Sequence, residues 1–276
     1  MPAPTFLCIG AQKCGTTWLA RAVKQHPQVS PGKRKELHFF NHREAYARGL
    51  EWYEAQFRKS PRTRATGEFT PNYWWTEGTD VPFHYLGAAD RIADAYPGLQ
   101  LIVCLRDPVA RAVSAYFHHL NAGRYPPSVG LLGAVERYPD IREFGLYATQ
   151  YAAWLRRFPA ERFLVLVYEE DIAPDAAKQA TLDRVFTHIG VEPGFQPAEV
   201  TEQRNVRQSD FSMRLKHASP ARRRLMSLVP QPLRDSRVWR IEVPDADRAA
   251  LAADFRPEVA RLEEMLGRSL PWSLDA

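Results

Sequence analysis

Hydrophobic residues form short continuous runs along the chain, and these alternate with stretches of helical periodicity. The runs at 5–9, 99–105 and 162–168 have the length and composition of buried strands, and 65–71 has the pattern of a short strand entering a proline-marked loop. Near-continuous apolar runs are typical of parallel sheets, because both faces of such sheets are covered. Apolar residues recur at helical spacing at 18–23, 44–60, 109–120, 146–158, 176–189 and about 245–266.

This alternation predicts the fold class. Strands that alternate with helices indicate an α/β domain with a mainly parallel central sheet flanked by helices. A chain of 276 residues can form one such domain with a full core, and no internal repeat or linker divides this one, so we predict a single domain over 1–276. The segment 194–244 has poor periodicity and contains Arg204, Arg207 and the run Arg222-Arg223-Arg224, so we expect an extended segment or a lid there.

The first predicted strand ends in a loop with the composition of a phosphate-binding site. Gly10 and Gly15 bound a loop that carries Lys13, and Thr16 and Thr17 follow at the start of the predicted helix. Glycines let the backbone approach an anion, the N–H groups at the helix start point at it, and the lysine adds a positive charge. A Walker A motif has its lysine after the second glycine, whereas Lys13 precedes Gly15. An ordinary tight strand-to-helix turn is the alternative interpretation.

A second polar group follows the apolar run at 99–105. Arg106, Asp107 and Pro108 end that run, and Ser114 lies two turns into the next predicted helix. Open α/β sheets bind ligands at the carboxyl ends of their strands. At this position the Arg106 guanidinium can bind an anion, and the Ser114 hydroxyl can donate a hydrogen bond to it. In the alternative interpretations, Asp107 holds Mg²⁺ as a Walker B carboxylate, or Arg106 and Asp107 only stabilise the turn.

Two further stretches carry candidate chemistry. After a loop at 27–35, Glu36 and His38 alternate with apolar residues, and on one face of an extended segment they are placed for acid/base work. The alternative is an exposed glutamate and a hydrogen-bonded histidine. The aromatic run at 73–75 beside a proline turn is either core or a platform for a sugar or aryl acceptor.

Charge and composition narrow the class of ligand. The net charge of +5 and the pI of about 9.1 favour anionic ligands. No run approaches the ~18 uninterrupted apolar residues that a membrane span needs. The first strand follows the N-terminal Met1-Pro2-Ala3-Pro4 without a basic stretch and an apolar leader, so we expect a cytoplasmic protein.

The chain contains three cysteines, without the spacing of metal ligands. Cys8 and Cys104 lie inside predicted strands, where buried thiols are expected. Cys14 lies in the first loop, where a reactive nucleophile is conceivable. We expect a small filler at that position instead, because no motif pairs Cys14 with a base.

Taken together, the two polar loops resemble the sulfotransferase family that uses PAPS (3′-phosphoadenosine 5′-phosphosulfate). The stretch Lys13-Cys14-Gly15-Thr16-Thr17-Trp18 is similar to that family's loop for the 5′-phosphosulfate, and Leu105-Arg106-Asp107-Pro108 with Ser114 is similar to its 3′-phosphate site. The resemblance covers about 5–171 and, more loosely, the C-terminal helix. It implies a P-loop-like strand–loop–helix, PAPS as co-substrate, PAP as product and no requirement for a metal.

The resemblance also implies roles for individual residues. Lys13 would neutralise charge on the leaving phosphate, Trp18 would stack on adenine, and Tyr168 would lie near that base. Arg106 and Ser114 would hold the 3′-phosphate. The implied nucleotide-binding set is Lys13, Cys14, Gly15, Thr16, Thr17, Trp18, Arg106, Ser114 and Tyr168.

Around Glu36 the sequence is most similar to the heparan-sulfate-type branch, in which a glutamate is the base, and Glu36 matches that position. Two departures stand out. The branch's following aspartate is Asn41 here, and the lysine of its Glu-Lys-Thr-Pro stretch is Phe69. Charge stabilisation would therefore rest more on Lys13 or on an unassigned cation. His38 is the second candidate for the base.

We therefore predict an enzyme that moves a sulfuryl group from PAPS to an acceptor hydroxyl by in-line attack, with Glu36 as base. The acceptor is a saccharide, which Trp52, Trp74 and Trp75 favour, or a small-molecule alcohol; neither nucleic acid nor a membrane is an expected partner. One alternative is a P-loop-like nucleotide-dependent kinase that uses Asp107. Another is a non-catalytic binder of acidic glycan or nucleic acid, which the basic pI would also explain.

Overall fold

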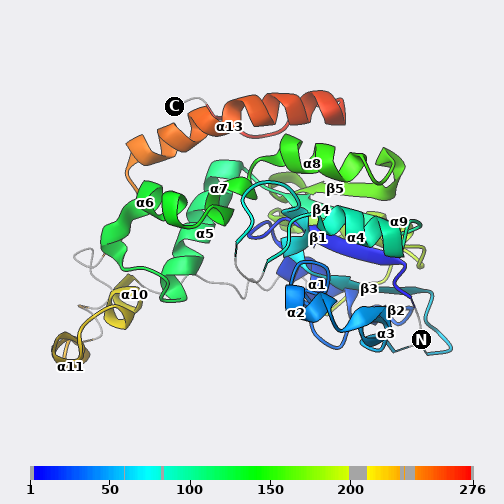
Figure 1. Ribbon diagram of the computed structural model, residues 1–276, viewed down its shortest axis with the longest axis horizontal. Coiled ribbons are helices and arrows are strands. Elements are labelled where there is room, and N and C mark those ends of the chain that lie inside the picture. The colour runs from blue at the N-terminus through cyan, green and yellow to red at the C-terminus, as the bar shows by residue number, and fades with distance from the viewer. Residues whose placement is uncertain are drawn as a thin grey trace.

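A five-stranded sheet forms the centre of the molecule (Figure 1). The computed structural model describes residues 3–58, 60–81, 84–198, 210–230, 233 and 240–274. Every pair of neighbouring strands is parallel, which confirms the predicted α/β class. In spatial order the strands are β2 (Val29–Pro31), β3 (Ala65–Phe69), β1 (Phe6–Gly10), β4 (Gln100–Leu105) and β5 (Phe163–Val167).

Four strands lie where the apolar runs predict them, but β2 lies within the stretch 27–35 that the sequence predicts as a loop. This edge strand has only three residues and bonds to β3 alone. Three residues are too few to show a hydrophobic run or an alternating pattern, so hydrophobic patterning does not detect this strand.

The predicted helical stretches are helical, but the sequence periodicity does not predict α4 (Ala88–Ala95), α6 (Gly130–Arg137) or α7 (Asp140–Glu143). The long helix α13 (Asp245–Leu266) matches the predicted 245–266. The stretch 44–60 forms two short helices, because Gly49 has a φ of 81° and interrupts a continuous helix. The other helices are α1 (Thr16–Val23), α2 (Arg43–Tyr46), α3 (Gly49–Glu54), α4 (Ala88–Ala95), α5 (Pro108–Asn121), α6 (Gly130–Arg137), α7 (Asp140–Glu143), α8 (Tyr147–Leu155) and α9 (Lys178–His188), with short turns η1 (Pro71–Trp74) and η4 (Tyr168–Ile172).

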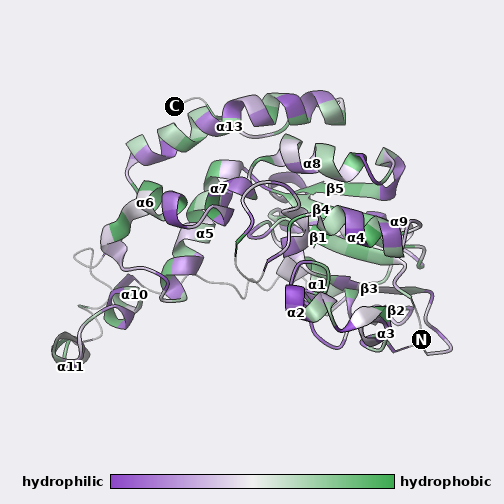
Figure 2. Ribbon diagram, in the orientation of Figure 1, coloured by the Kyte–Doolittle hydropathy of each residue, from purple (hydrophilic) through white to green (hydrophobic). Residues whose placement is uncertain are grey.

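Helices flank the sheet and complete the core. Helix α1 packs against α9 and β3, whereas α13 lies outside α8 and also contacts α5 (Figure 1). Strands β1, β4 and β5 are largely hydrophobic while α13 mixes polar and apolar residues (Figure 2), as expected for an outer helix with one buried stripe. Strand β1 is the middle strand of the sheet, and all five of its residues are buried.

Within 194–244, the described residues include α10 (Asp210–Lys216) and α11 (Pro220–Ser227), which extend from the α5 side of the molecule (Figure 1). Helix α10 is tied to the end of α5 because Lys216 Nζ donates to the Asn121 carbonyl oxygen at 2.8 Å. Arg204 and Arg207 lie outside the described residues. A lid role for the segment stays a prediction. No helix in the described part of the chain is long and apolar enough to cross a membrane.

Gly67 is a test of how tightly β3 packs on β1. A Cβ at this position would lie 2.2 Å from the Phe6 carbonyl oxygen and 2.7 Å from the Phe6 ring. We expect Gly67→Ala to lower the free energy of unfolding by about 2 kcal/mol or more, because backbone atoms must move. Gly98→Ala is the matched control, since nothing lies within 4 Å of a Cβ there. Urea denaturation measures both, and equal stabilities would contradict this account of the packing.

Candidate functional site

The loop between β1 and α1 is the first candidate anion-binding loop, and we call it the first cradle. Gly15 precedes α1 with a φ of 89°, and no side chain caps the helix N-terminus. The first N–H groups of the helix are therefore available to a ligand. A Cβ on Gly15 would lie 2.9 Å from Ile172 Cγ2 and 3.1 Å from the Tyr168 ring, so both conformation and space require glycine. Thr16 is buried and Thr17 is half-buried at the start of the helix.

Lys13 extends from this loop among other positive charges. The backbone φ of Lys13 is 71°. Among the described residues other than glycine, only Lys13 and His38 have a positive φ. Such conformations persist where the surroundings hold them and occur often at functional sites. Burial lowers the pKa of Lys13, and the charges of Arg106 and Lys35 lower it further. A cluster of cations that repel one another suits a polyanionic ligand.

The second cradle lies at the end of β4. The Arg106 guanidinium carbon is 4.7 Å from the centre of the Tyr168 ring, and its Nε has no hydrogen-bond partner among the described residues. Ser114 lies half-buried on α5. Asp107 Oδ1 accepts a hydrogen bond of 2.6 Å from the Ala110 N–H and so caps α5. That bond supports a structural role for Asp107 and not the Mg²⁺ ligand of the kinase alternative.

Tyr147 joins the two cradles. Its hydroxyl donates to the Arg106 carbonyl oxygen at 2.8 Å, lies 3.4 Å from the Arg106 N–H and is 3.7 Å from Cys14 Sγ. The Ala11 N–H also donates to the Cys104 carbonyl oxygen at 2.7 Å. Because β1 and β4 are parallel neighbours, their carboxyl ends meet at one edge of the sheet, and these bonds fix the two loops to each other.

Arg111 adds a cation beneath both loops that sequence reasoning missed. It lies on α5 with no exposed surface, and its Nη2 donates to the Ile141 carbonyl oxygen. Its Nε and Nη1 have no hydrogen-bond partner within the described residues. Burial lowers the pKa of Arg111, and the positive charge of Arg106 lowers it further. The only sequence signal was its helical spacing from Asp107 at the start of the same helix.

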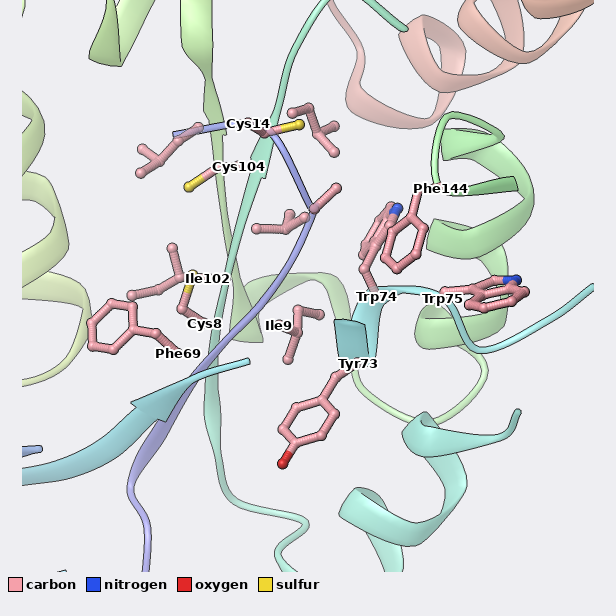
Figure 3. Packing of buried hydrophobic residues seen from close by; sticks show 14 of the residues in the cluster. Cys8, Ile9, Cys14, Phe69, Tyr73, Trp74, Trp75, Ile102, Cys104 and Phe144 are labelled. Carbon is pink, nitrogen blue, oxygen red and sulfur yellow. The ribbon is translucent and has the colours of Figure 1, made fainter. Parts of the chain in front are cut away.

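Cys14 is the small filler that its sequence context favours. Its side chain is fully buried, and burial raises the pKa of the thiol to about 11. A protonated buried thiol is a poor nucleophile. Cys8 and Cys104 are also buried, as predicted (Figure 3).

Glu36 and His38 lie together in the segment before α2, although this segment is not a strand. His38 Nε2 is 3.4 Å from Glu36 Oε2, and the Lys35 ammonium is hydrogen-bonded to Glu36 Oε1. Burial alone would raise the pKa of Glu36, but the hydrogen bonds from His38 and Lys35 outweigh it and lower the pKa to about 2. His38 Nδ1 is buried without a hydrogen-bond partner in the described part of the chain.

A groove of about 670 Å³ opens beside this segment. Leu37, which lies between Glu36 and His38, is one of its walls, and the Arg48 guanidinium lies 3.9 Å from the centre of the Trp52 ring on another. The groove is lined by Arg34, Leu37, His42, Glu44, Ala45, Arg48, Trp52 and Gln56. In the described residues, neither Arg34 nor Arg48 forms an ion pair with a carboxylate.

Trp74 and Trp75 do not form an exposed platform, so that alternative is wrong. Their side chains are 0% and 3% exposed, and Trp75 packs on Phe144 with ring centres 5.5 Å apart (Figure 3). Phe69 is also fully buried, with its ring 5.8 Å from that of Phe6. At position 69, where the heparan-sulfate-type branch has a lysine, this chain therefore has no positive charge. The cation beside Glu36 is Lys35.

Comparison with known proteins shows the family to which the chain belongs. The sulfotransferase domain family matches residues 3–211. Heparan sulfate glucosamine 3-O-sulfotransferase 6 of Mus musculus is 32% identical over 195 residues, which cover 68% of this chain and 53% of that protein. The membrane-associated sulfotransferase kil1 of Dictyostelium discoideum is 34% identical over 130 residues, or 45% of this chain and 25% of that one. This chain thus spans about half the length of the heparan sulfate relative.

Among solved structures, a sulfotransferase from Alicyclobacillus acidocaldarius has 26% sequence identity and a TM-score of 0.67, and the match covers 98% of both chains. The likeness therefore extends beyond the 3–211 region that the family matches. From the family match and these relatives, we conclude that the chain belongs to the sulfotransferase family.

Proposed function

We propose that the protein transfers a sulfuryl group from PAPS to the hydroxyl of an acceptor. The observation that carries the proposal is the junction of two anion cradles, at the ends of β1 and β4, through the Tyr147 hydroxyl. One adenosine bisphosphate has phosphate groups at two separate positions, and two adjacent cradles suit such a molecule. Positive charges on Lys13, Arg106 and Arg111 complement those phosphates.

Each cradle has a separate task in this proposal. Lys13, Thr16 and Thr17 bind the 5′-phosphate, and Arg106 with Ser114 binds the 3′-phosphate. Tyr168 touches both cradles, because its ring lies against Gly15 and under the Arg106 guanidinium. Its position supports a contact with the nucleoside, together with Trp18 on α1.

The proposed chemistry is an in-line transfer. The acceptor oxygen forms a bond to sulfur while the bond from sulfur to the 5′-phosphate oxygen breaks, and Glu36 accepts the hydroxyl proton. Lys13 offsets the charge that grows on the departing phosphate, an electrostatic contribution of about 3 kcal/mol for a well-placed group. Glu36 is the first candidate because it matches the position of the glutamate base in the heparan-sulfate-type branch, and His38 is the second. With its pKa lowered to about 2, Glu36 is ionised at neutral pH and therefore able to accept the proton.

The groove beside Glu36 is the proposed acceptor site. Trp52 offers an aromatic face for a sugar ring, and Arg34 and Arg48 offer positive charges to acidic groups on it. The similar heparan sulfate 3-O-sulfotransferase supports a saccharide acceptor over another small-molecule alcohol. The cytoplasmic location and the absence of a metal requirement stay predictions.

Nucleotide analogues test the two cradles separately. Arg106→Ala should weaken adenosine 3′,5′-bisphosphate at least tenfold, since a charge-assisted hydrogen bond contributes about 1.5–3 kcal/mol. The same change should alter adenosine 5′-phosphate affinity about twofold or less. Lys13→Ala should weaken both ligands, because both carry the 5′-phosphate. Isothermal titration calorimetry measures the four affinities. Equal losses of both ligands in Arg106→Ala would contradict the assignment of the 3′-phosphate.

The pH dependence of turnover tests the base. Because the pKa of Glu36 is lowered to about 2, its carboxylate stays ionised as the pH falls from neutral, and we expect kcat to remain level down to about pH 5.5. A histidine base would lose activity as the pH falls through about 6.5. Glu36→Gln should lower kcat about 10²-fold or more, and His38→Asn should have a smaller effect. If kcat of the wild type falls at acidic pH and this fall is absent in His38→Asn, the base is His38 and not Glu36.

A further inference from the structure

Glu68 is a buried carboxylate in β3 for which the proposed chemistry has no use. Its side chain is 1% exposed, at the end of the strand next to β1. It forms no ion pair with any described residue. Its two oxygens accept hydrogen bonds from Thr70 Oγ1 at 2.6 Å, the Tyr73 hydroxyl at 2.7 Å, the Tyr53 hydroxyl at 2.9 Å and the Leu37 N–H at 3.0 Å.

The directions of these bonds indicate an ionised carboxylate. A backbone N–H can only donate, so Leu37 donates to Glu68. The Tyr73 hydroxyl accepts a hydrogen bond from the Phe39 N–H at 3.0 Å, and Thr70 Oγ1 accepts one from the Leu37 N–H at 3.1 Å. The hydroxyl protons of Tyr73 and Thr70 are therefore free to be donated to Glu68. Burial raises the pKa of Glu68, and these hydrogen bonds act in the opposite direction. A carboxylate fits an arrangement in which its neighbours donate.

The network holds the backbone on both sides of His38. Leu37 is bound through its N–H to Glu68 and Thr70, and Phe39 is bound through its N–H to Tyr73. The residue between them, His38, has a φ of 53°. Residues other than glycine seldom adopt a positive φ and keep it only where the surrounding structure holds it. Glu36 directly precedes this fixed turn, so the direction of its side chain depends on the turn.

We propose that Glu68 is a positioning residue, whose buried carboxylate fixes the turn at 37–39 and thereby aims Glu36 at the acceptor. The proposal rests on the proposed function, in which Glu36 is the base. Glu68 acts through Tyr73, Thr70 and the Leu37 N–H, and it does not touch the reacting atoms. A buried carboxylate without a cation destabilises a fold compared with an apolar residue, which is consistent with its use for geometry.

Two tyrosines provide a matched pair of variants. The hydroxyls of Tyr53 and Tyr73 both donate to the same oxygen of Glu68, and both side chains are fully buried. Only the Tyr73 hydroxyl also binds the turn, through the Phe39 N–H. Tyr53→Phe and Tyr73→Phe therefore remove equivalent bonds to Glu68, but only Tyr73→Phe releases the turn.

We expect Tyr73→Phe to lose more stability than Tyr53→Phe, because it also leaves the buried Phe39 N–H without its partner, and only Tyr73→Phe to lose turnover. In Tyr73→Phe, kcat should fall about tenfold or more while the affinity for adenosine 3′,5′-bisphosphate is unchanged. Glu68→Gln should lower kcat in the same way, because an amide cannot accept from every neighbour. Equal kcat values in the two phenylalanine variants, or losses that follow melting temperature alone, would overturn the proposal. If Tyr73→Phe does not fold, Thr70→Val removes the other hydroxyl that binds the turn.

Hydrogen exchange separates this proposal from the proposed function. Amide exchange in a peptide covering 36–41 should be faster in Tyr73→Phe than in wild type, and unchanged in Tyr53→Phe. If wild type transfers no sulfuryl group but the exchange differs in this way, the proposed function fails while the fixing of the turn by Tyr73 holds. Equal exchange in both variants would overturn the positioning role whatever the activity.

Discussion

The parallel pairing of β1 with β4 is the constraint on which the candidate site depends. Parallel neighbours end at the same edge of a sheet, so the loop carrying Lys13 and the turn carrying Arg106 have to emerge side by side. Bonds across the gap then remove the remaining freedom. The Ala11 N–H binds the Cys104 carbonyl oxygen, and Tyr147 touches both Cys14 and the backbone of Arg106.

A concentration of positive charge at this edge destabilises the protein without a ligand. Burial lowers the pKa of Lys13, and the charges of Arg106 and Lys35 lower it further. Arg111 has two buried nitrogens without a described hydrogen-bond partner. Each of these arrangements opposes folding. An anion that entered the cradles would neutralise the repulsion. In the proposed function, the same features that weaken the empty protein would therefore favour tight binding of a bisphosphate.

Much of the fold was predictable because its signals are local. Apolar runs revealed four strands, and polar residues at the ends of two of them indicated the cradles. The edge strand β2 was missed because it is too short to need an apolar run. Trp74 and Trp75 could not be assigned to core or surface, since their burial depends on partners such as Phe144 that are remote in sequence. The contacts of Tyr147 and Glu68 likewise join segments that are distant in sequence, and spacing along the chain does not encode them.

The most direct test of the central claim is a crystal structure of the protein with adenosine 3′,5′-bisphosphate. We predict a single nucleotide with its 5′-phosphate among Lys13, Thr16 and Thr17, and its 3′-phosphate against Arg106 and Ser114. A nucleotide that touched only one of the two loops, or that bound at another face of the sheet, would contradict the account.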